Sequence, residues 1–160
     1  MRARLPRAAL ALAVSLAFVE ARALETLPPL VAAAKSGNQA AALVLVSQGT
    51  GIDEAAADGT TALHWAVQSA DRKLVGALLA AGADANAANR YGMTPQHLAA
   101  INGDAETLRL LLAAGADPNV HDLSGMTPLD VADEHGAHDI AALLLRYGGK
   151  SSRELAPQQP

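Results

Sequence analysis

Apolar and polar residues alternate along most of the chain with the period of an α-helix. Leu108, Leu111 and Leu112 lie at positions i, i+3 and i+4, which puts them on one face of a helix. Similar apolar stripes occur earlier in the chain, at Leu74, Leu78 and Leu79, and later, at Leu143–Leu145. A glycine suited to ending a helix follows each stripe, at Gly82, Gly115 and Gly148. The pattern predicts a series of short amphipathic helices.

This pattern repeats at a fixed interval along the chain. Residues 58–90 align with residues 91–123 without an insertion, and the segment Gly82–Asn86 aligns with Gly115–Asn119. A fixed period of this length indicates stacked repeats rather than a closed globule. Such a stack offers an extended surface to a partner and, by itself, no reaction centre.

Each unit is predicted to contain a turn and two antiparallel helices. In the third unit, residues 91–123, Gly92 suits a tight turn, Thr94 suits the N-cap of a helix, and Pro95 suits the first position of that helix. This helix should end near Gly103, and the next one should begin at Asp104, whose carboxylate favours a helix N-terminus. Because one helix pair cannot bury both of its apolar sides, neighbouring pairs must stack.

The third unit resembles the ankyrin repeat. The matching motifs are Thr94-Pro95-x-His97-Leu98-Ala99-Ala100, Gly103-Asp104, Leu110-Leu111-Leu112 and Gly115-Ala116-Asp117-x-Asn119. The resemblance covers about residues 27–149, in four units that keep strict register. It implies an all-α fold, namely an ankyrin repeat solenoid of about four helix-turn-helix repeats with short β-turn fingers.

The predicted organisation has six segments. We expect a signal peptide at residues 1–23 and an N-terminal capping repeat at residues 24–57. Two central repeats follow at residues 58–90 and 91–123, then a C-terminal capping repeat at residues 124–150 and a disordered tail at residues 151–160. In the first unit Pro28-Pro29 replaces the Thr-Pro motif, and in the last unit Asp130 and Asp133 replace the motif His and the second motif Ala. A more polar last unit suits the end of a stack, where it meets water.

The segment 1–23 has the features of a secretory signal peptide. Three arginines precede the apolar run Ala8–Val19, and Ala21-Arg22-Ala23 supplies the small residues of a cleavage site before Leu24. The run is shorter than the roughly 20 apolar residues that a membrane-spanning helix needs. We therefore expect a periplasmic or secreted location with no membrane attachment after cleavage, and an uncleaved N-terminal anchor is the alternative. The alanine-rich run and the lack of disulfides favour a bacterial cell envelope.

Charge and composition narrow the classes of partner. Cleavage would leave 8 basic and 15 acidic residues, a net charge of −7, whereas nucleic acids and anionic membranes require cationic patches. The chain has no cysteine, which excludes disulfides, a thiolate nucleophile and cysteine metal ligands. We expect no cofactor and no nucleic acid, and we expect a monomer whose partner is another protein.

Few residues suggest chemistry. The resemblance implies a structural role for His64 and His97, and no nucleophile accompanies them in catalytic order, so we predict that the protein is not an enzyme. The segment 133–139 is the one group with metal-ligand residue types, and His135 and His138 lie three positions apart. Gly136 separates them, which favours a solvated polar cap. A metal or small-molecule binding module that uses this C-terminal His/Asp cluster remains the alternative function.

Two further residues differ in type from the residues at the same position of the other units. Trp65 occupies the slot of Leu98 and Val131, where it either fills the core or serves as a platform for a ligand. Gln96 occupies a slot that is leucine in the second and last units. A buried amide without a partner costs about 1–3 kcal/mol, so Gln96 either bonds a neighbouring turn or weakens the fold.

The resemblance implies that partners bind the turn tips and the concave face of the first helices. The residues at the corresponding positions are Thr60, Gln68, Ser69, Arg90, Tyr91, Met93, Ile101, Asn102, Leu123, Ser124, Met126, Glu134 and His135. Five of them would form a contiguous apolar patch, which is typical of a protein-binding site: Tyr91, Met93, Ile101, Leu123 and Met126. The alternative is that Met93 and Met126 pack between adjacent tips.

Overall fold

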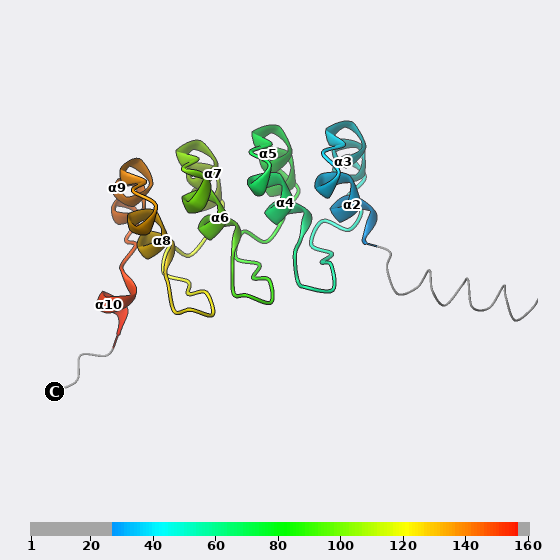
Figure 1. Cartoon of the computed structure of the whole chain (residues 1–160). Coiled ribbons are helices and arrows are strands. Elements are labelled where there is room, and N and C mark those ends of the chain that lie inside the picture. The colour runs from blue at the N-terminus through cyan, green and yellow to red at the C-terminus, as the bar shows by residue number, and fades with distance from the viewer. Residues whose placement is uncertain (1–26, 157–160) are drawn as a thin grey trace, which may run out of the picture.

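The computed structural model describes residues 27–156 as four helix pairs stacked in sequence order, with a short helix after the last pair (Figure 1). The first helices of the pairs are α2 (Pro29–Lys35), α4 (Ala62–Gln68), α6 (Pro95–Asn102) and α8 (Pro128–Glu134). The second helices are α3 (Gln39–Ser47), α5 (Arg72–Ala80), α7 (Ala105–Ala113) and α9 (His138–Arg146). Within residues 27–156 no strand forms, and the predicted all-α solenoid is confirmed. The predicted signal peptide lies outside the described residues.

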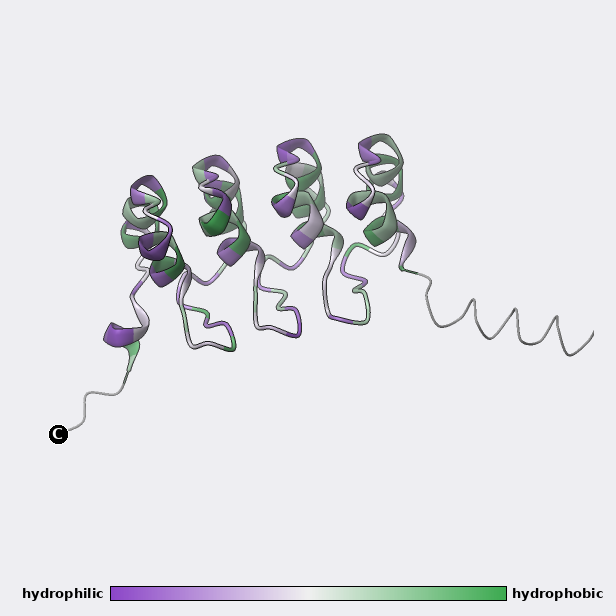
Figure 2. Ribbon diagram, viewed as in Figure 1, coloured by the Kyte–Doolittle hydropathy of each residue, from purple (hydrophilic) through white to green (hydrophobic). Residues whose placement is uncertain are grey.

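The helices form two layers along the stack. The inner layer consists of α2, α4, α6 and α8, each in contact with the next, and the outer layer consists of α3, α5, α7 and α9 in the same order. The buried core between them is built mainly from alanine, leucine and valine, as in Ala66, Ala99 and Leu108. Small side chains let neighbouring helices approach closely. Figure 2 shows most of the hydrophobic residues within the helix pairs and hydrophilic ones at the turns.

Local sequence rules account for the helix starts. Thr94 is the N-cap of α6 with Pro95 at its first position, as predicted. Asp104, expected in the first turn of α7, is its N-cap instead and accepts from the backbone N–H of Thr107. In α6 the motif His97 completes a capping box, because its side chain reaches back to the backbone N–H of Thr94. The same arrangement opens α4 and α8.

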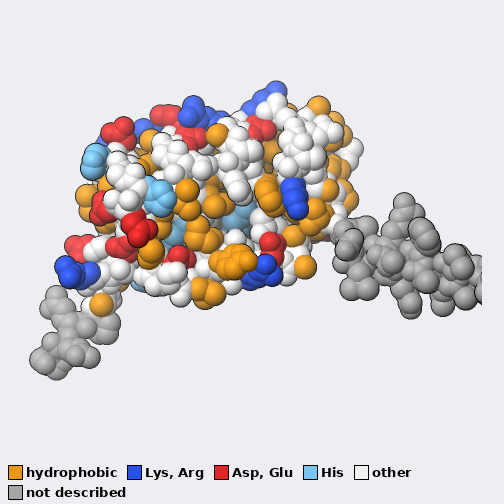
Figure 3. Space-filling view, viewed as in Figure 1, with side chains coloured by type: hydrophobic (Ala, Val, Ile, Leu, Met, Phe, Trp, Pro, Cys, Tyr) orange, Lys and Arg blue, Asp and Glu red, His pale blue; other side chains and the backbone are white. Residues whose placement is uncertain are grey.

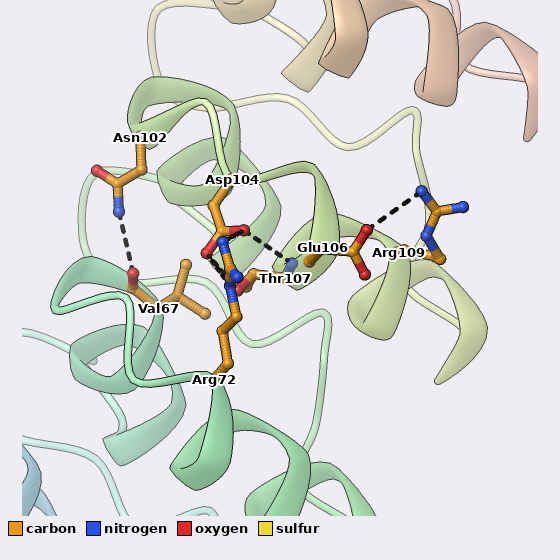
Figure 4. Close-up of polar contacts among 7 residues, drawn as sticks. All are labelled: Val67, Arg72, Asn102, Asp104, Glu106, Thr107 and Arg109. Carbon is orange, nitrogen blue, oxygen red and sulfur yellow. Dashed lines mark hydrogen bonds and ion pairs between the residues drawn. The ribbon is translucent and has the colours of Figure 1, made fainter.

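Polar side chains link the starts of successive outer helices. Gln39 Nε2 donates to Asp71 Oδ1 at 2.7 Å. One unit later, Arg72 forms an ion pair with Asp104 at 2.9 Å, which Figure 4 shows. Burial alone would raise the pKa of Asp104, but hydrogen bonds from Arg72 and Thr107 outweigh it and lower that pKa. Figure 4 also shows Asn102 Nδ2 donating to the carbonyl of Val67 in the preceding unit.

Three loops leave the stack as fingers, at residues 50–60, 83–93 and 116–126 (Figure 1). Adjacent fingers are joined by backbone hydrogen bonds, from Arg90 N to Asp58 O at 2.8 Å and from Leu123 N to Tyr91 O at 2.9 Å. Gly92 has a φ of 71°, and a Cβ at this position would lie only 2.8 Å from the backbone nitrogen of Leu123. The close approach of the fingers therefore requires glycine here.

The C-terminal segment differs from the disordered tail expected from residue 151 onward. Residues Ser152–Leu155 form the short helix α10, capped by Ser151 through a capping box with Glu154. The backbone N–H of Ser152 also donates to Asp130 in α8 at 2.8 Å. Serine at an N-cap with glutamate three residues later is a helix-start pattern that the compositional argument overlooked.

Candidate functional site

The motif histidines connect each inner helix to the next finger. Nδ1 of His97 accepts from the backbone N–H of Thr94 at 3.2 Å and lies 2.9 Å from the hydroxyl of Thr94. The ring proton is therefore on Nε2, which donates to the carbonyl of Met126 at 3.1 Å. His64 makes the equivalent contacts with Thr61 and with the carbonyl of Met93. Both rings hold the fingers in place, which confirms the structural role.

Burial sets the charge state of these histidines. Both side chains are fully buried, and this burial lowers the pKa of His64 and His97 below the usual value. The neutral ring is also the form that can accept at Nδ1 and donate at Nε2. Because both nitrogens of each ring are engaged within the fold, neither His64 nor His97 has a nitrogen available to act on a substrate.

The last unit replaces the motif histidine by Asp130 for a reason that the structure supplies. Within residues 27–156 no further finger follows the last helix pair, so the carbonyl acceptor that His97 uses has no counterpart there. The chain after α9 offers the backbone N–H of Ser152 instead, and Asp130 Oδ2 accepts it together with the N–H of Thr127 at 2.9 Å. Burial alone would raise the pKa of Asp130, but these hydrogen bonds outweigh it and lower the pKa. A residue that only accepts suits this position.

The inner surface is the combination of the inner helices and the three fingers. Ten of the thirteen predicted contact residues are exposed in the structure: Gln68, Ser69, Arg90, Tyr91, Ile101, Asn102, Leu123, Ser124, Glu134 and His135. Met93 and Met126 are half-buried. Thr60 is buried, which corrects its assignment to the contact surface.

Of the five apolar residues expected to form one patch, three are exposed and two, Met93 and Met126, are half-buried. Tyr91 and Leu123 are at the tips of adjacent fingers and are 54% and 78% exposed. Met126 packs against the core, as the alternative interpretation proposed. Ile101 lies six positions after Pro95 in α6, about 9 Å along the helix axis. The exposed apolar surface on the fingers is therefore the tip pair, defined as Tyr91 and Leu123.

Among the described residues, the side chains of the C-terminal His/Asp cluster are not brought together. His135 ends α8 and its Nδ1 lies 2.9 Å from the carbonyl of Val131, whereas His138 begins α9 beyond the turn. Within residues 27–156 no group of three or more His, Cys, Asp or Glu residues is arranged to hold a metal ion. The structure thus gives no support to the alternative function.

Sequence reasoning missed a hollow at the other end of the inner surface. Lys35, at the end of α2, places its Nζ 5.2 Å from the centre of the Trp65 ring, and both residues line a cavity of about 280 Å³. In the register of the repeats, Lys35 occupies the same slot as Gln68 and Ile101, two of the predicted contact residues. Extending the predicted register by one unit toward the N-terminus would have identified Lys35 as a contact residue.

The comparisons with known proteins agree with this architecture. A family model described as ankyrin repeats (3 copies) matches residues 9–89 and residues 70–153, and its first match begins inside the predicted signal peptide. A search of curated proteins found no match. Among the described residues, no helix is both long enough and apolar enough to cross a membrane. The chain therefore belongs to the ankyrin repeat family, whose repeats generally mediate protein–protein interaction.

Proposed function

We propose that this protein is a non-catalytic scaffold, exported to the cell envelope, that binds one protein partner through its finger tips and inner helix face. The observation that carries the proposal is the tip pair, Tyr91 and Leu123, two large apolar side chains exposed on adjacent fingers. Tyrosine is enriched in protein interfaces, and exposed apolar groups beside charged ones are typical of them.

Rigidity of the fingers supports this role. The backbone bond between Leu123 and Tyr91 fixes the two tips relative to each other. His97 fixes the base of the third finger through the carbonyl of Met126. A surface that is already ordered loses little conformational entropy on binding, which favours affinity for a partner of matching shape.

An affinity capture tests the surface. The purified protein is presented to a cell-envelope extract, and bound proteins are identified by mass spectrometry and then titrated in purified form. We expect a partner whose affinity falls at least about tenfold when Tyr91 and Leu123 are both changed to glutamate. The matched control changes Leu145 and Tyr147, which are exposed on the outer helix α9 and at its C-terminal end, to glutamate. A partner that loses affinity only with the control variant would refute the assignment.

Export is tested separately by intact mass. Protein recovered from the envelope fraction should begin at Leu24, in agreement with the predicted cleavage site after Ala23. Protein that retains residues 1–23, or that is found only in the cytoplasm, would contradict the proposal of export.

A further inference from the structure

A small hollow opens between the first and second units on the inner surface. Its apolar wall includes Leu27, Ala56 and Ala57, and the ring of Trp65 forms part of the lining. The cavity volume of about 280 Å³ lies below the roughly 300–1,000 Å³ of sites that enclose drug-sized ligands. The hollow therefore suits a side chain of a bound polypeptide better than a cofactor.

Two cations line this hollow against one carboxylate. Lys35 and Arg90 contribute the positive charges, and Asp58 contributes the negative charge. Asp58 Oδ1 already accepts the backbone N–H of Thr60 at 3.0 Å. In the part of the chain that the structure describes, neither cation forms a salt bridge. Lys35 rests over the Trp65 ring. Arg90 rests over the Tyr91 ring and donates from one guanidinium nitrogen to the Tyr91 hydroxyl at 2.9 Å, so neither cation is neutralised by a bonded carboxylate.

Trp65 adds an independent observation. Its Nε1 is buried and has no hydrogen-bond partner among residues 27–156. A buried donor without an acceptor is costly, by about 1–3 kcal/mol, and such groups are rare in folded proteins.

The charge at the ends of the inner helices changes along the stack and favours an anion at the end where the hollow lies. The slot at the end of each inner helix holds Lys35, Gln68, Ile101 and Glu134 in order along the stack, so its charge changes from positive to negative. Asp133 and Glu134 are exposed at the α8 end, and Figure 3 shows acidic side chains gathered toward that end of the molecule. A carboxylate is therefore attracted to the Lys35 end and repelled from the other.

We propose that the hollow bounded by Lys35, Trp65 and Arg90 receives a glutamate or aspartate side chain of the protein partner, flanked by aliphatic residues. This inference rests on the proposed function and specifies the chemistry of the partner segment. The carboxylate would lie between the two cations, where charge-assisted hydrogen bonds are strongest, and its aliphatic neighbours would cover the apolar wall. The same contacts would orient the partner, with its acidic end over α2 and α4.

Nuclear magnetic resonance tests this with peptide probes and needs no identified partner. Trp65 is the only tryptophan, so its indole N–H gives a single resonance that reports on the hollow. The probes are two capped pentapeptides, Gly-Leu-Glu-Leu-Gly and the same peptide with glutamine in place of glutamate. We expect a saturable shift with the glutamate peptide and at least about tenfold weaker binding of the glutamine peptide.

Variants locate the interaction. Lys35→Gln should weaken binding of the glutamate peptide about fivefold or more, whereas Lys73→Gln, the same charge change on the exposed side of α5, should leave it unchanged. Equal affinity for the two peptides, equal effects of the two variants, or no saturable shift at about 10 mM peptide would each overturn the inference. None of these results would decide the tip-pair test, which measures the affinity of a captured protein partner and not the binding of a peptide.

Discussion

Replacing Gln96 by leucine tests how a buried amide affects the stability of the stack. Gln96 is fully buried, and its Nε2 donates to the carbonyl of Asp117 in the third finger at 2.8 Å. Its Oε1 is buried without a hydrogen-bond partner among residues 27–156. The second and last units have leucine in this slot, at Leu63 and Leu129, and both leucines are buried. The fold therefore accommodates the substituted side chain.

The opposing contributions can be compared in magnitude. Removing the unpartnered Oε1 relieves a cost of about 1–3 kcal/mol, and losing the Nε2 bond to Asp117 removes about 0.5–1.5 kcal/mol of stabilisation. Leucine also buries more apolar surface than glutamine, which adds to the gain. We expect Gln96→Leu to raise the free energy of unfolding by about 1 kcal/mol and the melting temperature by roughly 3–5 °C.

Thermal and urea unfolding followed by circular dichroism measure this change. The matched control is the reverse substitution, Leu63→Gln, in which the amide faces Asp84, the counterpart of Asp117 in the preceding finger. It should lower the melting temperature by a similar amount. If Gln96→Leu instead lowers the melting temperature by several degrees, the hydrogen bond to Asp117 outweighs the unpartnered oxygen and the reasoning is refuted.

Three further predictions concern the caps, the fingers and the histidines. Ala137 is the N-cap of α9 and has backbone angles close to those of Asp71, so Ala137→Asp should add about 1 kcal/mol to the free energy of urea unfolding, and no gain would contradict the capping argument. Gly92→Ala should lower the free energy of unfolding by about 2 kcal/mol or more, because the added Cβ would approach the next finger closely. The equivalent Gly125→Ala, which has open space, should lower the free energy of unfolding by less, and equal losses would refute this. Because burial lowers the pKa of His64 and His97, the unfolded chain binds protons first as the pH falls. Stability should therefore be highest above about pH 6.5 and decrease toward about pH 5, by at most about 1.4 kcal/mol per pH unit for each histidine, and an unchanged urea midpoint would count against it.

The fold was predictable because its determinants are local and recur. Thr94, Pro95 and Asp104 start helices by rules that depend on a few neighbouring residues, and the fixed period of the repeats then dictates the stacking. The structural role of the histidines also followed from the resemblance, although the receiving carbonyl of Met126 belongs to the next unit. That connection becomes visible only once the units are stacked.

The candidate site was less predictable because exposure depends on contacts between units. Thr60 shares a motif position with Met93 and Met126, yet it is buried whereas they are half-buried. The hollow at Trp65 depends on Lys35, which comes from the neighbouring unit and is marked only by the register of the repeats. The tail was misjudged from its composition, since Ser152 bonds to a carboxylate that lies 22 positions earlier.

The central claim is that the fingers and inner helices, and not the outer helices, bind the partner. Amide hydrogen exchange of the protein with and without its captured partner measures this directly. The account predicts slower exchange on binding in the finger loops 83–93 and 116–126 and in the inner helices α4 and α6, with α5 and α7 unchanged. Slower exchange confined to α3, α5, α7 and α9 would contradict it.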